Sequence, residues 1–215
     1  MRNLESLPWS GLEDADRLLV EEPLALVIGF VLDQQVTIET AFRGPLRLRE
    51  RMGGWRLDAG VIAATPEEEL VEIFRQKPAL HMFPANMAGR VQGVCRIIAD
   101  PDRYANHAEN IWLTAASGED LYNRVRELPG FGDGKARILV GVLGNLFEVA
   151  PAGWREWRMD RPSLADCDSK AKLLEYRIWK KAWKAEQKAV AAGTGAGPIA
   201  ASQPSNRVRD HRTPA

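Results

Sequence analysis

The stretch that decides the fold reads Leu128-Pro129-Gly130-Phe131-Gly132-Asp133-Gly134-Lys135-Ala136-Arg137-Ile138-Leu139. Helical segments flank its Gly-rich turn, Glu119 to Leu128 before it and Lys135 to Phe147 after it. Glycines can take positive φ and let the backbone approach a ligand closely. The N–H groups that open the second helix point outward, and the helix dipole makes them an anion site. We therefore predict a helical hairpin that grips a phosphate backbone without reading bases.

The hairpin offers main-chain amides, two cations and an aromatic ring that closes it from inside. The candidate contact residues are Gly130, Phe131, Gly132, Gly134, Lys135 and Arg137. The alternative is an ordinary turn whose glycines only terminate a helix. The motif Leu-Pro-Gly-x-Gly, followed shortly by Lys-Ala, is a more specific signal than a single Gly-rich turn. It therefore favours the phosphate site.

The rest of the chain also reads as helices joined by short turns. Leu24 to Phe42 predicts one long helix that stops before Gly44-Pro45, and Asp14 to Leu19 a short one. Thr65 is expected to cap a helix that has Pro66 at its first position. Met87 to Ile98 repeats apolar residues at helical spacing. Because no alternating run typical of a strand is found, the predicted class is all-α.

Composition excludes several kinds of protein. The 215 residues carry 29 basic and 29 acidic side chains, so no global field attracts nucleic acid or membrane. Cys95 and Cys167 are the two cysteines, too few for a four-cysteine zinc site or iron–sulfur cluster. The scattered histidines form no metal pair, and the N-terminus lacks a signal-peptide core. We expect a cytoplasmic protein without metal, cofactor or membrane association.

The C-terminal part differs in composition. Lys170 to Lys188 holds seven Lys/Arg against two Glu, which predicts an amphipathic helix with one basic face. The residues from about Glu186 onward contain few apolar side chains that could be buried in a core. The sequence thus predicts a helical domain over 1–185, with its hairpin at 128–139, and a disordered tail over 186–215.

Three segments, in order, resemble the HhH-GPD superfamily of base-excision DNA glycosylases, which includes endonuclease III and the alkylpurine glycosylases. The hairpin looks like that family's helix-hairpin-helix. The segment from Val31 to Val36 is similar to its Leu-Ser-x-Gln segment, and Phe83 to Ile98 looks like the stretch in which a wedge loop opens a helix. The resemblance covers about Leu24 to Phe147.

The resemblance implies two helical lobes, with duplex DNA across the cleft between them and a damaged nucleotide flipped out into it. By position, Gln35 takes the role of the polar side chain that fills the gap, and Phe83 that of the wedge. The alternatives are a surface amide for Gln35 and core packing for Phe83.

The resemblance also implies a carboxylate that stabilises the sugar during bond cleavage. An ungapped count from the hairpin reaches Ala152 instead of the family's Asp. The nearby carboxylates are Glu156 and Asp160, and they are the candidate catalytic residues. Trp154 and Trp157 flank Glu156 and would give it an apolar environment that raises its pKa. The alternative is a surface ion pair with Arg155 or Arg158.

Some members of the family carry a Lys nucleophile in the hairpin, and Gly134 occupies that position here, with Lys135 next to it. The sequence therefore predicts a monofunctional DNA N-glycosylase without lyase activity, acting as a monomer on double-stranded DNA with a damaged base. The alternative is a non-catalytic hairpin module that binds duplex DNA.

Overall fold

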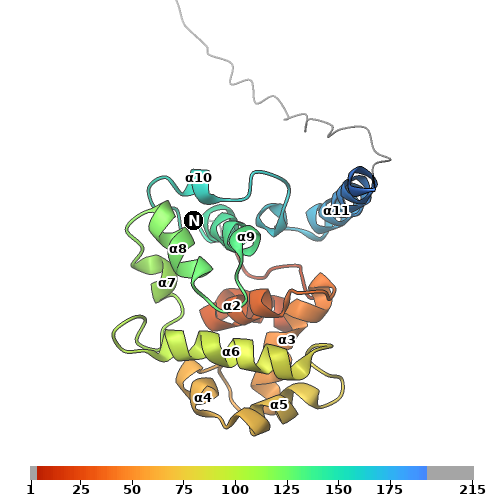
Figure 1. Cartoon of the computed structure of the whole chain (residues 1–215). Helices are drawn as coiled ribbons and strands as arrows, with labels where there is room; N and C mark the ends of the chain where they lie inside the picture. The colour runs from red at the N-terminus through yellow and green to blue at the C-terminus, as the bar shows by residue number, and fades with distance from the viewer. Residues whose placement is uncertain (1–3, 193–215) are drawn as a thin grey trace, which may run out of the picture. The chain divides into compact units, whose positions relative to one another are not determined.

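The computed structural model describes residues 4–192, and every regular element in that range is helical (Figure 1). The all-α prediction is confirmed. The elements are α1 (Glu13–Glu21), α2 (Pro23–Leu32), α3 (Ile38–Arg51), α4 (Ala59–Ala64), α5 (Glu67–Arg75), α6 (Pro84–Ala99), α7 (Asn110–Leu113), α8 (Gly118–Arg126), α9 (Asp133–Leu146), α10 (Trp154–Trp157), the 3₁₀ turn η1 (Leu164–Asp166) and α11 (Lys170–Ala191).

The long helix predicted for Leu24 to Phe42 is wrong, because a tight turn divides it into α2 and α3. Gln35 lies in the left-handed region with φ 57°, which interrupts the helix. Thr37 then caps α3, its hydroxyl accepting a hydrogen bond from the Thr40 N–H at 3.2 Å. The helix also runs through Pro45 instead of stopping before it. Burial of one face of α3 outweighs the one backbone hydrogen bond that proline removes.

The start of α5 also differs from the prediction. Thr65 does not cap it, because its hydroxyl donates to the Val61 carbonyl at 2.8 Å and so closes the end of α4. The N-cap position of α5 is Pro66, and the helix begins at Glu67 with three acidic residues in its first turn. Those carboxylates favour the helix through its dipole, without a side-chain cap.

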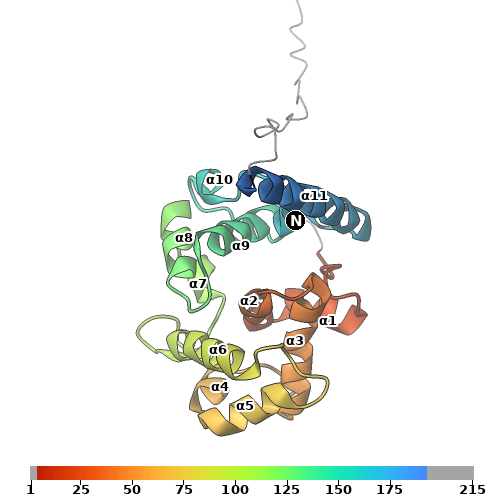
Figure 2. The ribbon, with the colours of Figure 1, turned by 45° about the vertical axis from the view of Figure 1, so that its right-hand side comes forward.

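The first group of helices packs around an aromatic cluster. The rings of Trp9, Phe30 and Phe42 meet edge to face, with centroids 4.9 to 6.2 Å apart, and all three are buried. Helices α1, α2 and α3 contact one another, and α4 and α5 contact α6 (Figures 1 and 2). Gly29 permits the close approach of α2 and α3, since an added Cβ would lie 2.6 Å from the Phe42 ring.

The second group consists of α8, α9, α10 and η1, and the α8–α9 hairpin joins it to the first. Phe131 of the hairpin lies 6.4 Å from the Phe30 ring of α2, centroid to centroid. The Pro129 ring rests on Gly93 of α6, where an added Cβ would meet it at 3.3 Å. The connection between α8 and α9 accordingly lies beside α2 in Figure 1.

The final helix, α11, crosses from one compact unit, Met1–Arg177, into a second, Ile178–Ala215. In the first unit Arg177 pairs with Glu39 of α3. In the second, the Trp179 and Trp183 rings stack with centroids 5.9 Å apart. The helix runs to Ala191, past the boundary expected at residue 186. The rest of the expected tail, 193–215, lies outside the described residues.

Candidate nucleic-acid interface

The hairpin turn is held from inside and open on the outside. Leu128 and Phe131 are buried, and the Phe131 N–H donates to the Leu128 carbonyl at 3.0 Å. Gly130 takes φ 88°, so glycine is needed there for the backbone conformation. Gly132 has an extended backbone, and no atom lies within 4 Å of the place where its Cβ would stand. The turn therefore keeps open space beside its main chain.

The first turn of α9 lacks a side-chain cap, because Gly132 is its N-cap residue. Asp133 stands in this turn, but its carboxylate accepts hydrogen bonds from the Tyr122 hydroxyl at 2.6 Å and Arg137 Nε at 3.0 Å. These hydrogen bonds lower the pKa of Asp133. The acid is thus engaged by its neighbours, and the helix N-terminus retains N–H groups suited to an anion.

A cavity of about 450 Å³ adjoins the hairpin. Its lining brings together the C-terminal end of α2, one arginine of α6 and the start of α9: Asp33, Gln34, Arg90, Gly130, Phe131, Gly132 and Lys135. This cavity is a shallow hollow that is widely open to solvent. Two cations, one carboxylate and one aromatic ring share this space.

Lys135 enters the cavity from the first turn of α9. Its ammonium nitrogen lies 5.7 Å from the centroid of the Phe131 ring. Burial lowers the pKa of Lys135 to about 8, with a further lowering by Arg90, while the Asp33 carboxylate acts in the opposite direction. At neutral pH the amine is therefore mostly protonated, but closer to deprotonation than an exposed lysine.

His81 ties the two loops at the cavity together. Its Nδ1 accepts a hydrogen bond from the Phe83 N–H at 3.1 Å, so its Nε2 carries the proton and donates to the Gln34 carbonyl at 2.8 Å. The His81 ring is almost fully buried. As a result Phe83, which is 48% exposed at the N-cap of α6, is fixed to the turn that contains exposed Gln35.

The comparisons with known proteins agree with this arrangement. A model of the HhH-GPD superfamily of base excision DNA repair proteins matches residues 28–192. The chain belongs to this superfamily. Searches of curated proteins and of solved structures returned no match. The helix-hairpin-helix expected from the sequence is the α8–α9 hairpin. Its family makes this HhH-GPD chain a base excision DNA repair protein.

Glu156 and Asp160 line a different cavity of this HhH-GPD protein, also of about 450 Å³. Four arginines dominate it, and its lining residues are Asp133, Gly134, Arg137, Arg155, Glu156, Arg158, Met159, Asp160 and Arg161. Glu156 is exposed, so the apolar environment expected from its flanking tryptophans is absent. Gly134 and Arg137 face this cavity, where Arg137 lies over the Tyr122 ring at 5.2 Å.

Packing of Trp154 explains why the segment after α9 follows this path. An added Cβ on Gly144 of α9 would lie 2.2 Å from the Trp154 ring, and one on Gly118 would lie 2.3 Å from the Trp154 Cα. The Gly118 N–H also donates to the Ala152 carbonyl at 2.8 Å. These contacts hold the segment, including the Ala152 that the ungapped count reached, against α8 and α9.

Sequence reasoning missed four residues that line the hairpin cavity or contact its lining: Asp33, Gln34, His81 and Arg90. Asp33 lies in the segment similar to Leu-Ser-x-Gln and occupies the position of its Ser. The change from Ser to Asp is the feature of the sequence that could have identified Asp33. Arg90 donates from Nη1 to Gln34 Oε1. From the sequence, His81 was assessed only as a possible metal ligand. None of its neighbours in the sequence indicates that its ring joins two loops.

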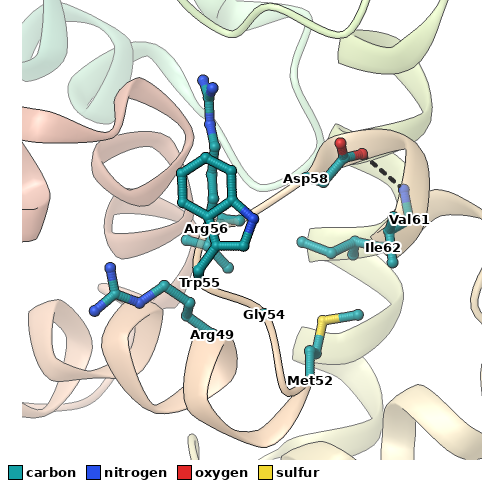
Figure 3. A pocket seen from close by; sticks show the side chains of 9 residues that line it. Arg49, Met52, Gly54, Trp55, Arg56, Asp58, Val61 and Ile62 are labelled. Atoms are coloured by element: carbon teal, nitrogen blue, oxygen red, sulfur yellow. Dashed lines mark hydrogen bonds between the residues drawn. The ribbon is translucent and has the colours of Figure 1, made fainter.

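A third cavity, about 280 Å³, lies at the α3–α4 connection, where Trp55 and Arg56 lie close together in the view of Figure 3. None of the residues predicted from the sequence line it. Within residues 4–192 no cluster of three or more metal-ligating side chains occurs. In the same part of the chain no helix combines the length and hydrophobicity needed to cross a bilayer.

Proposed function

We propose that this HhH-GPD protein is a monofunctional DNA N-glycosylase that binds duplex DNA as a monomer and hydrolyses the N-glycosidic bond of a damaged, flipped-out base. The observation that carries the proposal is the uncapped N-terminus of α9 beside a cavity containing Asp33, Lys135 and Arg90. The hairpin amides of Gly130 and Gly132 bind the strand backbone, and the neighbouring cavity receives the extruded nucleotide.

Two loops joined through Gln34, which lines the cavity, support base extrusion. Phe83 is exposed and attached through His81 to the turn carrying Gln35. We propose that the Phe83 ring stacks between bases while the Gln35 amide hydrogen-bonds the orphaned base. Exposure of Phe83 supports this role over the alternative of core packing.

Lys135 acts as a phosphate-binding cation in this proposal. Because its pKa is about 8, its positive charge is present below pH 8 and is lost as the pH rises above that value. We expect duplex affinity at constant ionic strength to fall several-fold from pH 7 to pH 9. Lys135→Met should weaken binding at pH 7, remove this pH dependence, and reduce the salt slope by about one.

The control for Lys135 is Lys172→Met, which removes an exposed lysine paired with Asp168. This variant should keep the pH dependence of the wild type. Fluorescence anisotropy with a labelled duplex measures both variants. An unchanged pH profile in Lys135→Met would show that another group titrates.

We propose hydrolysis without lyase chemistry because Gly134, which has no amine, occupies the position of the family's Lys nucleophile. We expect the wild-type protein to release bases from a panel of alkylated, oxidised and deaminated duplexes, leaving intact abasic strands. Sodium borohydride should trap no protein–DNA adduct at pH 7. A trapped adduct that disappears in Lys135→Met would contradict the monofunctional assignment.

The second candidate is a duplex-binding module without catalysis. Glu156 and Asp160 line the arginine-rich cavity and not the cavity that Gly130 and Gly132 line, which favours this module over catalysis by those two acids. Salt-dependent duplex binding by the wild type with no base release from any lesion would support this module. Base release that Glu156→Gln or Asp160→Asn abolishes, with binding intact, would establish the catalytic role predicted from the sequence.

A further inference from the structure

The hairpin cavity contains its own carboxylate, Asp33, at the C-terminal end of α2. We propose that Asp33 is a catalytic residue that faces the positively charged sugar and takes the proton from the attacking water. This inference rests on the glycosylase function proposed above. It identifies a carboxylate that the sequence comparison left unassigned, in the same cavity as the hairpin amides.

The position of Asp33 is fixed by the end of α2. It is the C-cap residue, and its N–H donates to the Gly29 carbonyl at 3.0 Å. The next residue, Gln34, is held at its carbonyl by His81 and at its side chain by Arg90. Asp33 therefore enters the cavity from a braced turn, while Lys135 enters from α9.

The Asp33 carboxylate lines the cavity and interacts electrostatically with two other titratable groups. The Asp33 charge raises the pKa of Lys135 against the lowering by burial. It also raises the pKa of Tyr176, a buried phenol near the start of α11 whose pKa burial already raises. The carboxylate is thus close enough to both groups to act on their protonation.

The location of Asp33 is unfavourable for helix stability. A negative charge at the C-terminal end of a helix interacts unfavourably with the dipole, and Asp33 is half-buried there. A sequence selected for stability alone would place a cation or a neutral cap at this position. A half-buried acid that lines a cavity beside a lysine is a candidate for chemistry.

The proposed step is a hydrolysis. The C1′–N bond breaks and its electron pair leaves with the base, while the Asp33 carboxylate stabilises the positive charge on the sugar. A water oxygen then forms a bond to C1′, and the water proton passes to Asp33. Asp33 gives this proton to the departing base, so one water is consumed and the carboxylate is restored.

Single-turnover base release tests this assignment directly. Asp33→Asn keeps the shape of the side chain and removes its charge, so we expect duplex binding within a few-fold of wild type and base release reduced by roughly 100-fold or more. The matched control is Asp14→Asn, which removes an exposed carboxylate from α1 and should retain base release. Full activity in Asp33→Asn would overturn the proposal.

A second measurement does not depend on knowing the lesion. A duplex with a cationic pyrrolidine in place of one nucleotide imitates the charged sugar, and a neutral tetrahydrofuran duplex is its reference. We expect wild type to bind the pyrrolidine duplex at least about tenfold more tightly, because transition-state mimics gain affinity. Asp33→Asn should lose this preference, and Asp14→Asn should keep it.

The outcomes separate the two proposals. Failure of wild type to bind either duplex would reject the proposed function itself. Binding of both duplexes with equal affinity would reject the role of Asp33 and leave DNA binding intact. A preference that survives in Asp33→Asn but is lost in Glu156→Gln or Asp160→Asn would transfer the role to one of those residues.

Discussion

Gly132→Val is expected to fold normally and to lose about 10- to 100-fold in affinity for duplex DNA of any sequence. No atom lies within 4 Å of the Cβ position, and φ is −92°, so the substitution meets neither a clash nor a strained backbone. The added side chain would instead occupy the space beside the α9 amides, where we propose that the phosphate lies. Anisotropy titrations with several unrelated duplexes, together with thermal unfolding, measure the two effects.

A matched variant, Gly132→Ser, separates binding from stability. A serine at this N-cap position can accept a hydrogen bond from an N–H of the first turn, so it should preserve or raise helix stability. The same hydrogen bond takes away a donor that the phosphate would use, and duplex affinity should fall. Loss of affinity for some sequences but not others would argue against a phosphate site, as would unchanged affinity in both variants.

Trp154→Ala is expected to lower the free energy of unfolding by about 3–5 kcal/mol. The indole is 5% exposed and fills the space that Gly144 leaves open on α9. Its removal creates a cavity between α9 and the segment that carries Glu156. Urea unfolding monitored by circular dichroism gives the change directly.

Trp55→Ala is the control for the loss of a tryptophan. Trp55 is 87% exposed, so its truncation should change stability by less than about 0.5 kcal/mol. If the two variants unfolded at the same urea concentration, the packing of Trp154 on Gly144 would not be what holds the 147–157 segment. That result would reopen the possibility that Glu156 reaches the hairpin cavity.

Local patterns were sufficient for the elements whose stabilising contacts are close in sequence. The Gly-rich turn between two amphipathic segments predicted the α8–α9 hairpin, because the conformation of Gly130 and the burial of Leu128 and Phe131 are properties of that stretch itself. The division between α2 and α3 was missed for the opposite reason. Neither glycine nor proline marks the turn between Asp33 and Thr37, and its residue Gln34 is held by His81 and Arg90 from elsewhere in the chain.

The candidate site likewise combines features that depend on local sequence with features that depend on contacts between distant segments. Phe83 and Gln35 were proposed from single segments that resemble the family, but the contact that joins their loops requires the buried ring of His81. The acids that follow the expected position in sequence, Glu156 and Asp160, lie in a second cavity because Trp154 packs on Gly144. Counting residues from the hairpin cannot reveal this, since the path of a segment depends on the surface that its buried side chains cover.

By itself the sequence determined the all-α class and the hairpin, because helix periodicity and glycine spacing act over a few residues. Only the tertiary structure decided which charges share a cavity. Asp33 and Lys135 are about a hundred positions apart in the chain, and the packing of Phe131 against Phe30 brings their helices together. Electrostatic and hydrogen-bond interactions depend on distance in space, and folding alone sets that distance.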